Sequence, residues 1–302
     1  MAILVPVDIR GDFAADIAKL CEIRLMAAGY AIEPAITPRK LILNYFNTRR
    51  LRISIKPRRV NLSREIHVPS QHNEGFKLIC ESSKRGISLM PHQSDRILNP
   101  ALNDKLLNDW NIYHLHLGAT PDLNKKGFMG RTSALLYLMI SEEDVYCIDV
   151  MSHRDFSKQR LLSIVHNNWP HLLEGWKLNS VMAGQNISDD DLQKMRKINV
   201  NTSIKMDDGT LYYAPGGGYA SDGTSLQVVM QANRLYRDCQ HLMDLTISNL
   251  KTFVDEYHKK FVFLSMPFHF HLQIIRGEAF AREQNSGAML RLKFPLDMPG
   301  IL

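Results

Sequence analysis

The stretch that most constrains the fold runs from residue 109 to residue 170, where three strand-like segments precede one amphipathic helix. The strand-like segments lie in DWNIYHLHLG, RTSALLYLMISEED and VYCIDVMSH, and they are separated by a loop and then by a tight turn. Strands joined in this way pair with their neighbours in the sequence. The helix DFSKQRLLSIVHNNW is closed by Pro170. This stretch therefore predicts an antiparallel meander with a closing helix.

The sequence on either side combines helix-like and strand-like segments. Residues 12 to 29 have the apolar spacing of a helix, and residues 225 to 260 repeat it over a longer run. A hairpin is predicted around Asp208 and Gly209, and FVFLSMPFHFHLQIIRG reads as strand. We expect an α+β fold. Its three regions are a helix and hairpin region (1–70), a central sheet domain (71–183) and a C-terminal domain with a glycine loop, a long helix and strands (184–302).

Composition and charge indicate the compartment and the kind of partner. The 37 Lys and Arg residues exceed the 31 Asp and Glu residues and give a net charge of +6, which favours polyanionic partners. The start, MAILVPVDIRGDF, is unlike a signal peptide, and no window reaches the roughly 18 apolar residues of a membrane helix. The four cysteines form no CxxC pair. We therefore expect a cytoplasmic protein with no membrane partner.

Basic residues are densest between positions 39 and 64. The segment LILNYFNTRRLRISIKPRRV favours a hairpin around Asn47 and Thr48, whose second strand would carry a basic face. Such a face can follow a phosphate backbone, although charges also protect an exposed strand from edge pairing. The first interpretation predicts a nucleic-acid surface that also includes two loop lysines. Its residues are Arg50, Arg52, Lys56, Arg58, Arg59, Lys125 and Lys126.

Two histidines alternate with apolar residues in the first strand of the meander. Because strand side chains alternate between faces, Ile112, His114 and His116 share one face. One histidine can take a proton from a 2'-hydroxyl, another can protonate the leaving oxygen, and cations can stabilise the phosphorane. This chemistry is metal-independent RNA cleavage and needs no cofactor. The candidate catalytic residues are His114, His116, Arg131, His153, Arg154 and Lys158.

Other interpretations of these histidines stay open. They could be ordinary surface or core residues, as a second H-x-H at His269 and His271 suggests. They could also ligate zinc, with Asp149 or His153 as a further ligand, because histidines two apart on a strand can bind one cation.

A glycine-rich segment precedes the long predicted helix. Its sequence GYASDGTS fits G-x-x-x-x-G-x-S, but Thr224 stands where a P-loop needs its phosphate lysine. This difference argues against an NTPase. Backbone amides at a helix N-terminus can still bind an anion, and the candidates are Gly216, Gly217, Gly218 and Ser225. Alternatively, Ser221, Asp222 or Ser225 caps the helix.

The order of a helix-containing lead-in, a three-stranded meander with a basic turn and a closing helix resembles the RelE and ParE superfamily of small bacterial toxins. The resemblance covers roughly residues 75 to 178 and is one of topology, with Arg131 and Lys158 as loose residue matches. It implies an endoribonuclease of toxin or phage-defence type. The alternative is a non-catalytic nucleic-acid-binding or protein-interaction component of such a system. Expected partners are RNA rather than DNA, an inhibitory or activating protein, and a second copy of the chain.

Overall fold

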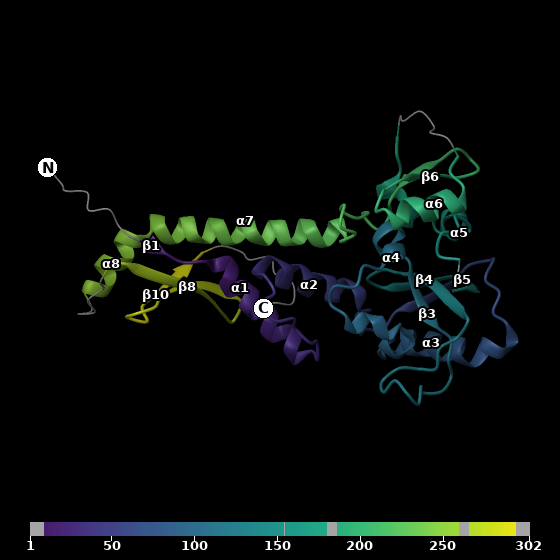
Figure 1. Cartoon of the computed structure of the whole chain (residues 1–302), viewed down its shortest axis with the longest axis horizontal. Coiled ribbons are helices and arrows are strands. Elements are labelled where there is room, and N and C mark those ends of the chain that lie inside the picture. The colour runs from purple at the N-terminus through teal and green to yellow at the C-terminus, as the bar shows by residue number, and fades with distance from the viewer. Residues whose placement is uncertain (1–8, 154, 180–185, 260–265, 294–302) are drawn as a thin grey trace. The chain divides into compact units, whose positions relative to one another are not determined.

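The structure is a computed structural model that describes residues 9–153, 155–179, 186–259 and 266–293 (Figure 1). It has the predicted α+β fold. The chain divides into two compact units, unit 1 (residues 1–46 and 230–302) and unit 2 (residues 47–229). The boundaries predicted after residues 70 and 183 both fall inside unit 2, which joins the central region to parts of both flanking regions.

Unit 1 contains a four-stranded sheet in the order β1-β8-β9-β10, in which β1 is parallel to β8 and the other pairs are antiparallel. Phe253 and Phe270 pack together in its core, with ring centroids 5.6 Å apart. The elements of this unit are β1 (Ile9–Arg10), α1 (Phe13–Ala27), α8 (Leu250–His258), β8 (Phe268–Ile275), β9 (Glu278–Glu283) and β10 (Met289–Leu292). Helices α2 (Pro38–Leu51) and α7 (Leu226–Ser248) contain the boundaries between the units.

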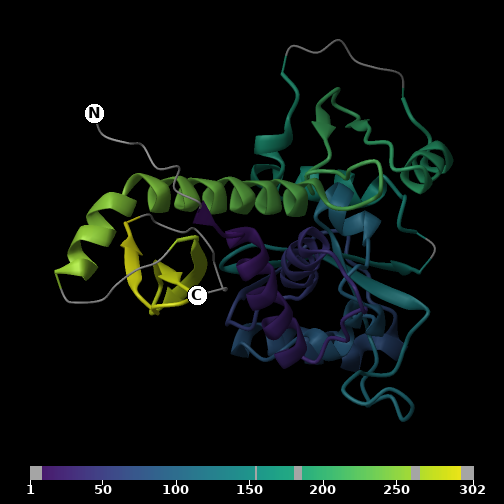
Figure 2. The same ribbon diagram turned by 60° about the vertical axis from the view of Figure 1, so that its left-hand side comes forward.

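The long helix predicted over 225 to 260 is two helices, α7 and α8, and α8 leaves the end of α7 at an angle (Figures 1 and 2). The side chains of Ser248 and Asn249 both donate hydrogen bonds to the carbonyl oxygen of Leu245. Such local bonds compete with helix continuation and account for the break. No helix in the described ranges is long and apolar enough to cross a membrane.

Unit 2 contains the predicted antiparallel meander, formed by β3 (Tyr113–His116), β4 (Ala134–Ile140) and β5 (Asp144–Ser152). A fourth strand, β2 (Arg59–Leu62), adds parallel to β5, so the sheet order is β2-β5-β4-β3. The helix α5 (Arg160–Asn168) follows the meander as expected. The other helices and strands of unit 2 are α3 (Asn73–Arg85), α4 (Lys105–Trp110), α6 (Asp189–Lys197), β6 (Ser203–Lys205) and β7 (Leu211–Tyr213). Its short 3-10 helices are η1 (Ser70–His72), η2 (Met90–His92), η3 (Asp95–Leu98), η4 (Pro170–Leu172) and η5 (Glu174–Trp176).

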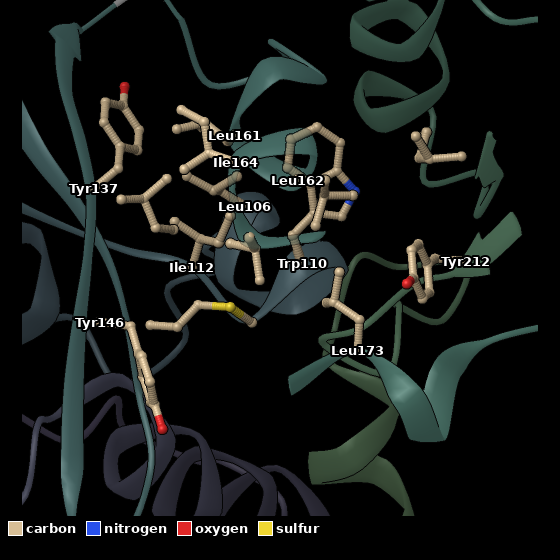
Figure 3. Close-up of a cluster of buried hydrophobic side chains, with 14 of the residues drawn as sticks. Leu106, Trp110, Ile112, Tyr137, Tyr146, Leu161, Leu162, Ile164, Leu173 and Tyr212 are labelled. Atoms are coloured by element: carbon tan, nitrogen blue, oxygen red, sulfur yellow. The ribbon is translucent and has the colours of Figure 1, made fainter. Parts of the chain in front are cut away.

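Both faces of this sheet are buried. One face packs on a core that includes Ile112, Tyr137 and Leu162 and to which α4, α5 and β7 contribute (Figure 3). The opposite face packs on a second core that includes Leu115, Leu136 and Ile79 of α3. The alternation predicted for β3 is therefore present, and His114 and His116 lie on the Ile112 face, where His114 is partly exposed and His116 is buried.

The hairpin predicted around Asn47 and Thr48 is wrong, because residues 38 to 51 form α2. Thr37 and Pro38 are a helix start that the strand interpretation overlooked: the Thr37 hydroxyl accepts a hydrogen bond from the Lys40 N–H at 3.3 Å, and Pro38 is the first helical residue. The basic residues that were expected to alternate along one strand face now lie on the end of a helix and on the segment after it.

Replacing Gly75 with alanine is expected to destabilise unit 2 by about 1–3 kcal/mol, the usual cost of overpacking. A Cβ at Gly75 would lie 2.0 Å from the carbonyl oxygen of Leu117, so α3 would have to move away from the end of β3. Gly175→Ala is the matched control because a Cβ there meets nothing within 4 Å. Urea denaturation measures both changes, and equal midpoints for the two variants would contradict this packing.

Candidate functional site

A pocket of about 370 Å³ lies in unit 2 beside β3. This volume falls within the range of roughly 300 to 1,000 Å³ that is common for small-ligand sites. Aromatic side chains of Tyr113 and Phe156 form part of its wall. Its acidic, basic and histidine lining residues are Arg96, Asp104, Lys105, His114, His153 and Arg196.

Two of the predicted catalytic histidines meet at this pocket. His114 comes from β3, and His153 follows β5, where its N–H donates to the Ser133 carbonyl at 3.0 Å and so continues the strand pairing. The ring of Phe156 lies edge-on to both, with centroid distances of 4.9 Å to His114 and 5.1 Å to His153. The meander therefore brings together two histidines that are far apart in the sequence.

Asp104 gives His114 a carboxylate neighbour. It is the N-cap of α4, and its Oδ1 accepts the Leu107 N–H at 3.0 Å. Its other oxygen, Oδ2, lies 3.8 Å from His114 Nδ1. Burial lowers the pKa of His114, the Asp104 charge opposes this shift, and the nearby charges of His153, Arg96 and Arg131 add to it. His114 is therefore a neutral imidazole beside a carboxylate near pH 7.

His116 lies deeper than His114 and has a structural setting. It is 2% exposed, its Nδ1 accepts the Thr132 N–H at 3.2 Å, and its carbonyl oxygen lies 3.0 Å from Nδ1 of His92. Burial, with a smaller contribution from the Arg131 charge, lowers the pKa of His116 to about 4. Its ring centroid is 6.1 Å from that of His153. His116 is therefore a buried, neutral side chain whose role is to support the residues of the pocket.

The His116 pKa predicts a pH dependence of stability. Between about pH 6.5 and pH 4 the unfolded chain binds this proton and the folded chain does not, so stability falls as the pH falls through that window. At roughly 1.4 kcal/mol per unit, the loss at pH 4 is about 3 kcal/mol. The variant His116→Asn keeps an acceptor for the Thr132 N–H and cannot titrate. Chemical denaturation at pH 7 and pH 4.5 is expected to give a smaller drop in unfolding free energy for the variant, and an equal drop would refute the assignment.

Arg196, from the last turn of α6, is one of the lining residues that sequence reasoning missed, together with Arg96, Asp104 and Lys105. Its Nε donates to Asp109 Oδ2 at 2.7 Å, and its Nη1 donates to the Phe156 carbonyl. Its guanidinium carbon lies 3.9 Å from the centroid of the Trp110 ring. The side chain of Arg196 is 6% exposed and that of Asp109 is 1% exposed. In the sequence, Arg196 is only a basic residue near a helix end, and no local signal distinguishes it.

Of the other predicted catalytic residues, Arg131 and Lys158 lie outside the pocket lining. Arg131 Nη1 pairs with Asp95 Oδ1 at 3.0 Å, and Lys158 pairs with Asp189 Oδ2 at 3.3 Å. Arg154 is outside the described residues. The pairing of Arg131 still leaves its charge near enough to His114 to affect that pKa.

The predicted nucleic-acid residues do not form one face. The Arg50 guanidinium is engaged in hydrogen bonds inside unit 2. It donates to the side chain of Asn108 at 2.9 Å and to the carbonyls of Leu107 and Gly216 at 2.8 and 3.1 Å. Arg58 is buried and donates to the carbonyls of Ser54 and Ser141.

The remaining members of that predicted set are mostly held by carboxylates. Lys56 pairs with Glu142 and Glu143, and Arg59 makes two hydrogen bonds to Asp144, at 2.9 and 2.8 Å. Lys125 pairs with Asp95, Lys126 is exposed, and Arg52 is half-buried. A continuous basic surface of these seven residues is therefore absent from the part of the chain that the structure describes.

The glycine segment uses its amides inside unit 2. The N–H groups of Gly216 and Gly218 donate to the carbonyls of Asp109 and Asn108 at 2.7 and 2.8 Å, at the end of α4. The Gly217 N–H donates to Ala214 at 2.7 Å. Ser225 is fully buried. The Gly216 and Gly218 N–H groups close the end of α4, and all three N–H groups are already engaged, so an incoming anion would have to displace a backbone acceptor from each.

The second H-x-H pair, His269 and His271, lies on β8 of unit 1. His271 Nδ1 is 3.0 Å from Asp16 Oδ1, which is the main cause of its raised pKa. Within the described ranges, no group of three or more His, Cys, Asp or Glu side chains could hold a metal ion. Comparison with protein-family models, curated proteins and solved structures returns no match.

Proposed function

We propose that unit 2 is a metal-independent endoribonuclease of toxin or phage-defence type that acts in the cytoplasm, with the pocket as its active site. The observation that carries this proposal is that His114 and His153 line one pocket with the guanidinium groups of Arg96 and Arg196. Two histidines can divide the base and acid roles of RNA cleavage, and cations can stabilise charge on the phosphorane. The resemblance to RelE and ParE adds support from topology.

In the proposed mechanism His114 is the base. It is neutral near pH 7 because burial lowers its pKa, and the Asp104 carboxylate favours the tautomer with the proton on Nδ1. Nε2 then accepts the proton of the 2'-hydroxyl while the 2'-oxygen bonds to phosphorus. The bond from phosphorus to the 5'-oxygen breaks as His153, in the role of general acid, gives a proton to that oxygen. The products are a 2',3'-cyclic phosphate and a 5'-hydroxyl.

The test is incubation of the full chain with a labelled single-stranded RNA in the presence of EDTA, beside the same sequence made as DNA. The expected result is cleavage of the RNA alone, with a 2',3'-cyclic phosphate end. Cleavage of the DNA at the same rate, or cleavage that requires a divalent ion, would rule out the mechanism. RNA binding without cleavage would reject the nuclease and leave a binding component.

Asp104→Asn is expected to lower the maximal cleavage rate roughly tenfold, because the neutral amide no longer favours the useful tautomer of His114. Asparagine still caps α4, so the unfolding free energy should change little. Because the Asp104 charge raises the His114 pKa, its removal moves the acid limb of the pH–rate profile to lower pH. A pH–rate profile measures both effects, and an unshifted acid limb would contradict the role given to Asp104.

A further inference from the structure

One side of the Arg196 guanidinium is buried and lacks a hydrogen-bond partner. Its Nη2 has no acceptor among the described residues, although the side chain is only 6% exposed. Nε already donates a hydrogen bond to the Asp109 carboxylate, and Nη1 donates one to the Phe156 carbonyl. A buried charged donor without an acceptor is unfavourable, so such a group in a pocket wall indicates a ligand that accepts from it.

The surroundings hold this donor in a fixed position. The Trp110 ring supports the guanidinium plane, and the Asp109 carboxylate fixes one edge of it. An arginine that is locked in this way loses little conformational freedom when it binds an oxyanion, and its planar fork suits phosphate oxygens.

The charged residues that line the pocket favour an anion, although Asp104 opposes it and the Asp109 carboxylate, outside the lining, offsets part of the Arg196 charge. Arg96 is exposed at the pocket and adds a second guanidinium. Lys105 Nζ donates hydrogen bonds to the carbonyls of Arg196 and Lys197 at 2.6 and 3.0 Å. It therefore contributes positive charge to the pocket rather than a hydrogen bond to the ligand. Asp104 is the opposing group, but one of its oxygens caps α4 and the other faces His114.

We infer that Arg196 is the phosphate anchor of this pocket and that the ligand is one unpaired nucleotide. A volume of about 370 Å³ admits a small group but not a base-paired helix. Bases of RNA can be taken up singly when they are unstacked, and aromatic walls such as Tyr113 and Phe156 suit a base. The assignment of an RNA nucleotide rests on the proposed function, whereas phosphate recognition by Arg196 does not.

The test is calorimetric titration of the full chain with four probes: inorganic phosphate, a nucleoside 3'-monophosphate, the same nucleoside and a short DNA single strand. The nucleoside monophosphate should bind at least tenfold more tightly than the nucleoside. Tight binding of the DNA strand would indicate a phosphate within a chain, and preference for the monophosphate would indicate a free nucleotide or a chain end. Equal affinities for nucleoside and monophosphate would overturn the inference.

Three variants assign the binding to Arg196. Arg196→Gln alone would leave Asp109 buried without its partner, so the first variant combines Arg196→Gln with Asp109→Asn. The second variant, Arg96→Gln, tests the exposed cation separately. We expect the double variant to lose at least tenfold in affinity for the monophosphate and Arg96→Gln to lose several-fold. Arg85→Gln, at the exposed end of α3, is the matched control and should bind as the parent does.

The outcome separates this inference from the nuclease proposal. Binding that depends on Arg196, in a protein that cleaves no RNA, would leave the phosphate anchor in place and reject the nuclease. RNA cleavage combined with unchanged binding by a folded double variant would reject the anchor alone. Circular dichroism of each variant identifies a loss of folding, in which case Arg96→Gln decides whether the pocket binds the phosphate.

Discussion

Replacing His114 with alanine is expected to lower the rate of RNA cleavage by about 10²- to 10⁴-fold, the usual contribution of a general base. His114 is the neutral imidazole of the pocket, with Nδ1 3.8 Å from the Asp104 carboxylate and its ring against Phe156. Cleavage assays under single-turnover conditions measure the change directly. The alanine variant should bind RNA nearly as well as the parent, because the cations of the pocket are retained.

The control for this prediction is His171→Ala. His171 is an exposed histidine of unit 2 in η4, away from the pocket lining. The His171→Ala protein should therefore cleave RNA at the parental rate. A His114→Ala protein that keeps its melting temperature and cleaves normally would show that His114 has no chemical role. A large fall in melting temperature would instead indicate that the imidazole mainly supports the core around Phe156.

The meander could be predicted from the sequence because its signal is local. The alternation in 112 to 117 assigns His114 and His116 to the Ile112 face, and the structure places them on that face. The sequence did not indicate that both faces are covered, since Ile79 of α3 and Leu162 of α5 come from distant positions. His116 therefore appeared equivalent to His114, although one is a buried support and the other lines a pocket.

The basic region shows why charge along a sequence does not locate a binding surface. Arg58 is a charged residue in a polar segment, yet it is buried and donates to three backbone carbonyls. Arg50 is engaged in the same way, because its acceptors belong to the distant residues Leu107, Asn108, Gly216 and Gln227. Conversely, Asp104 and Arg196 carry ordinary helix-end signals, and only long-range packing brings them to His114 and Phe156.

Replacing Asp109 with alanine is expected to lower the unfolding free energy by about 3–5 kcal/mol, because it leaves the Arg196 charge buried without its counterion. Asp109 is 1% exposed, and its Oδ2 accepts the Arg196 Nε–H at 2.7 Å. Asp191→Ala is the matched control, since its pair with Lys194 is exposed and should be worth at most about 1 kcal/mol. Urea denaturation at pH 7 measures both variants.

A double variant shows whether the loss comes from the unpaired charge or from lost packing. Asp109→Leu with Arg196→Met removes both charges and keeps apolar volume against Trp110, and replacements of this kind are often neutral or stabilising. We expect it to recover most of the stability that Asp109→Ala loses. It should also lose the affinity for phosphate, because the donor Nη2 is gone. A double variant less stable than Asp109→Ala would mean that packing, rather than the buried charge, dominates at this position.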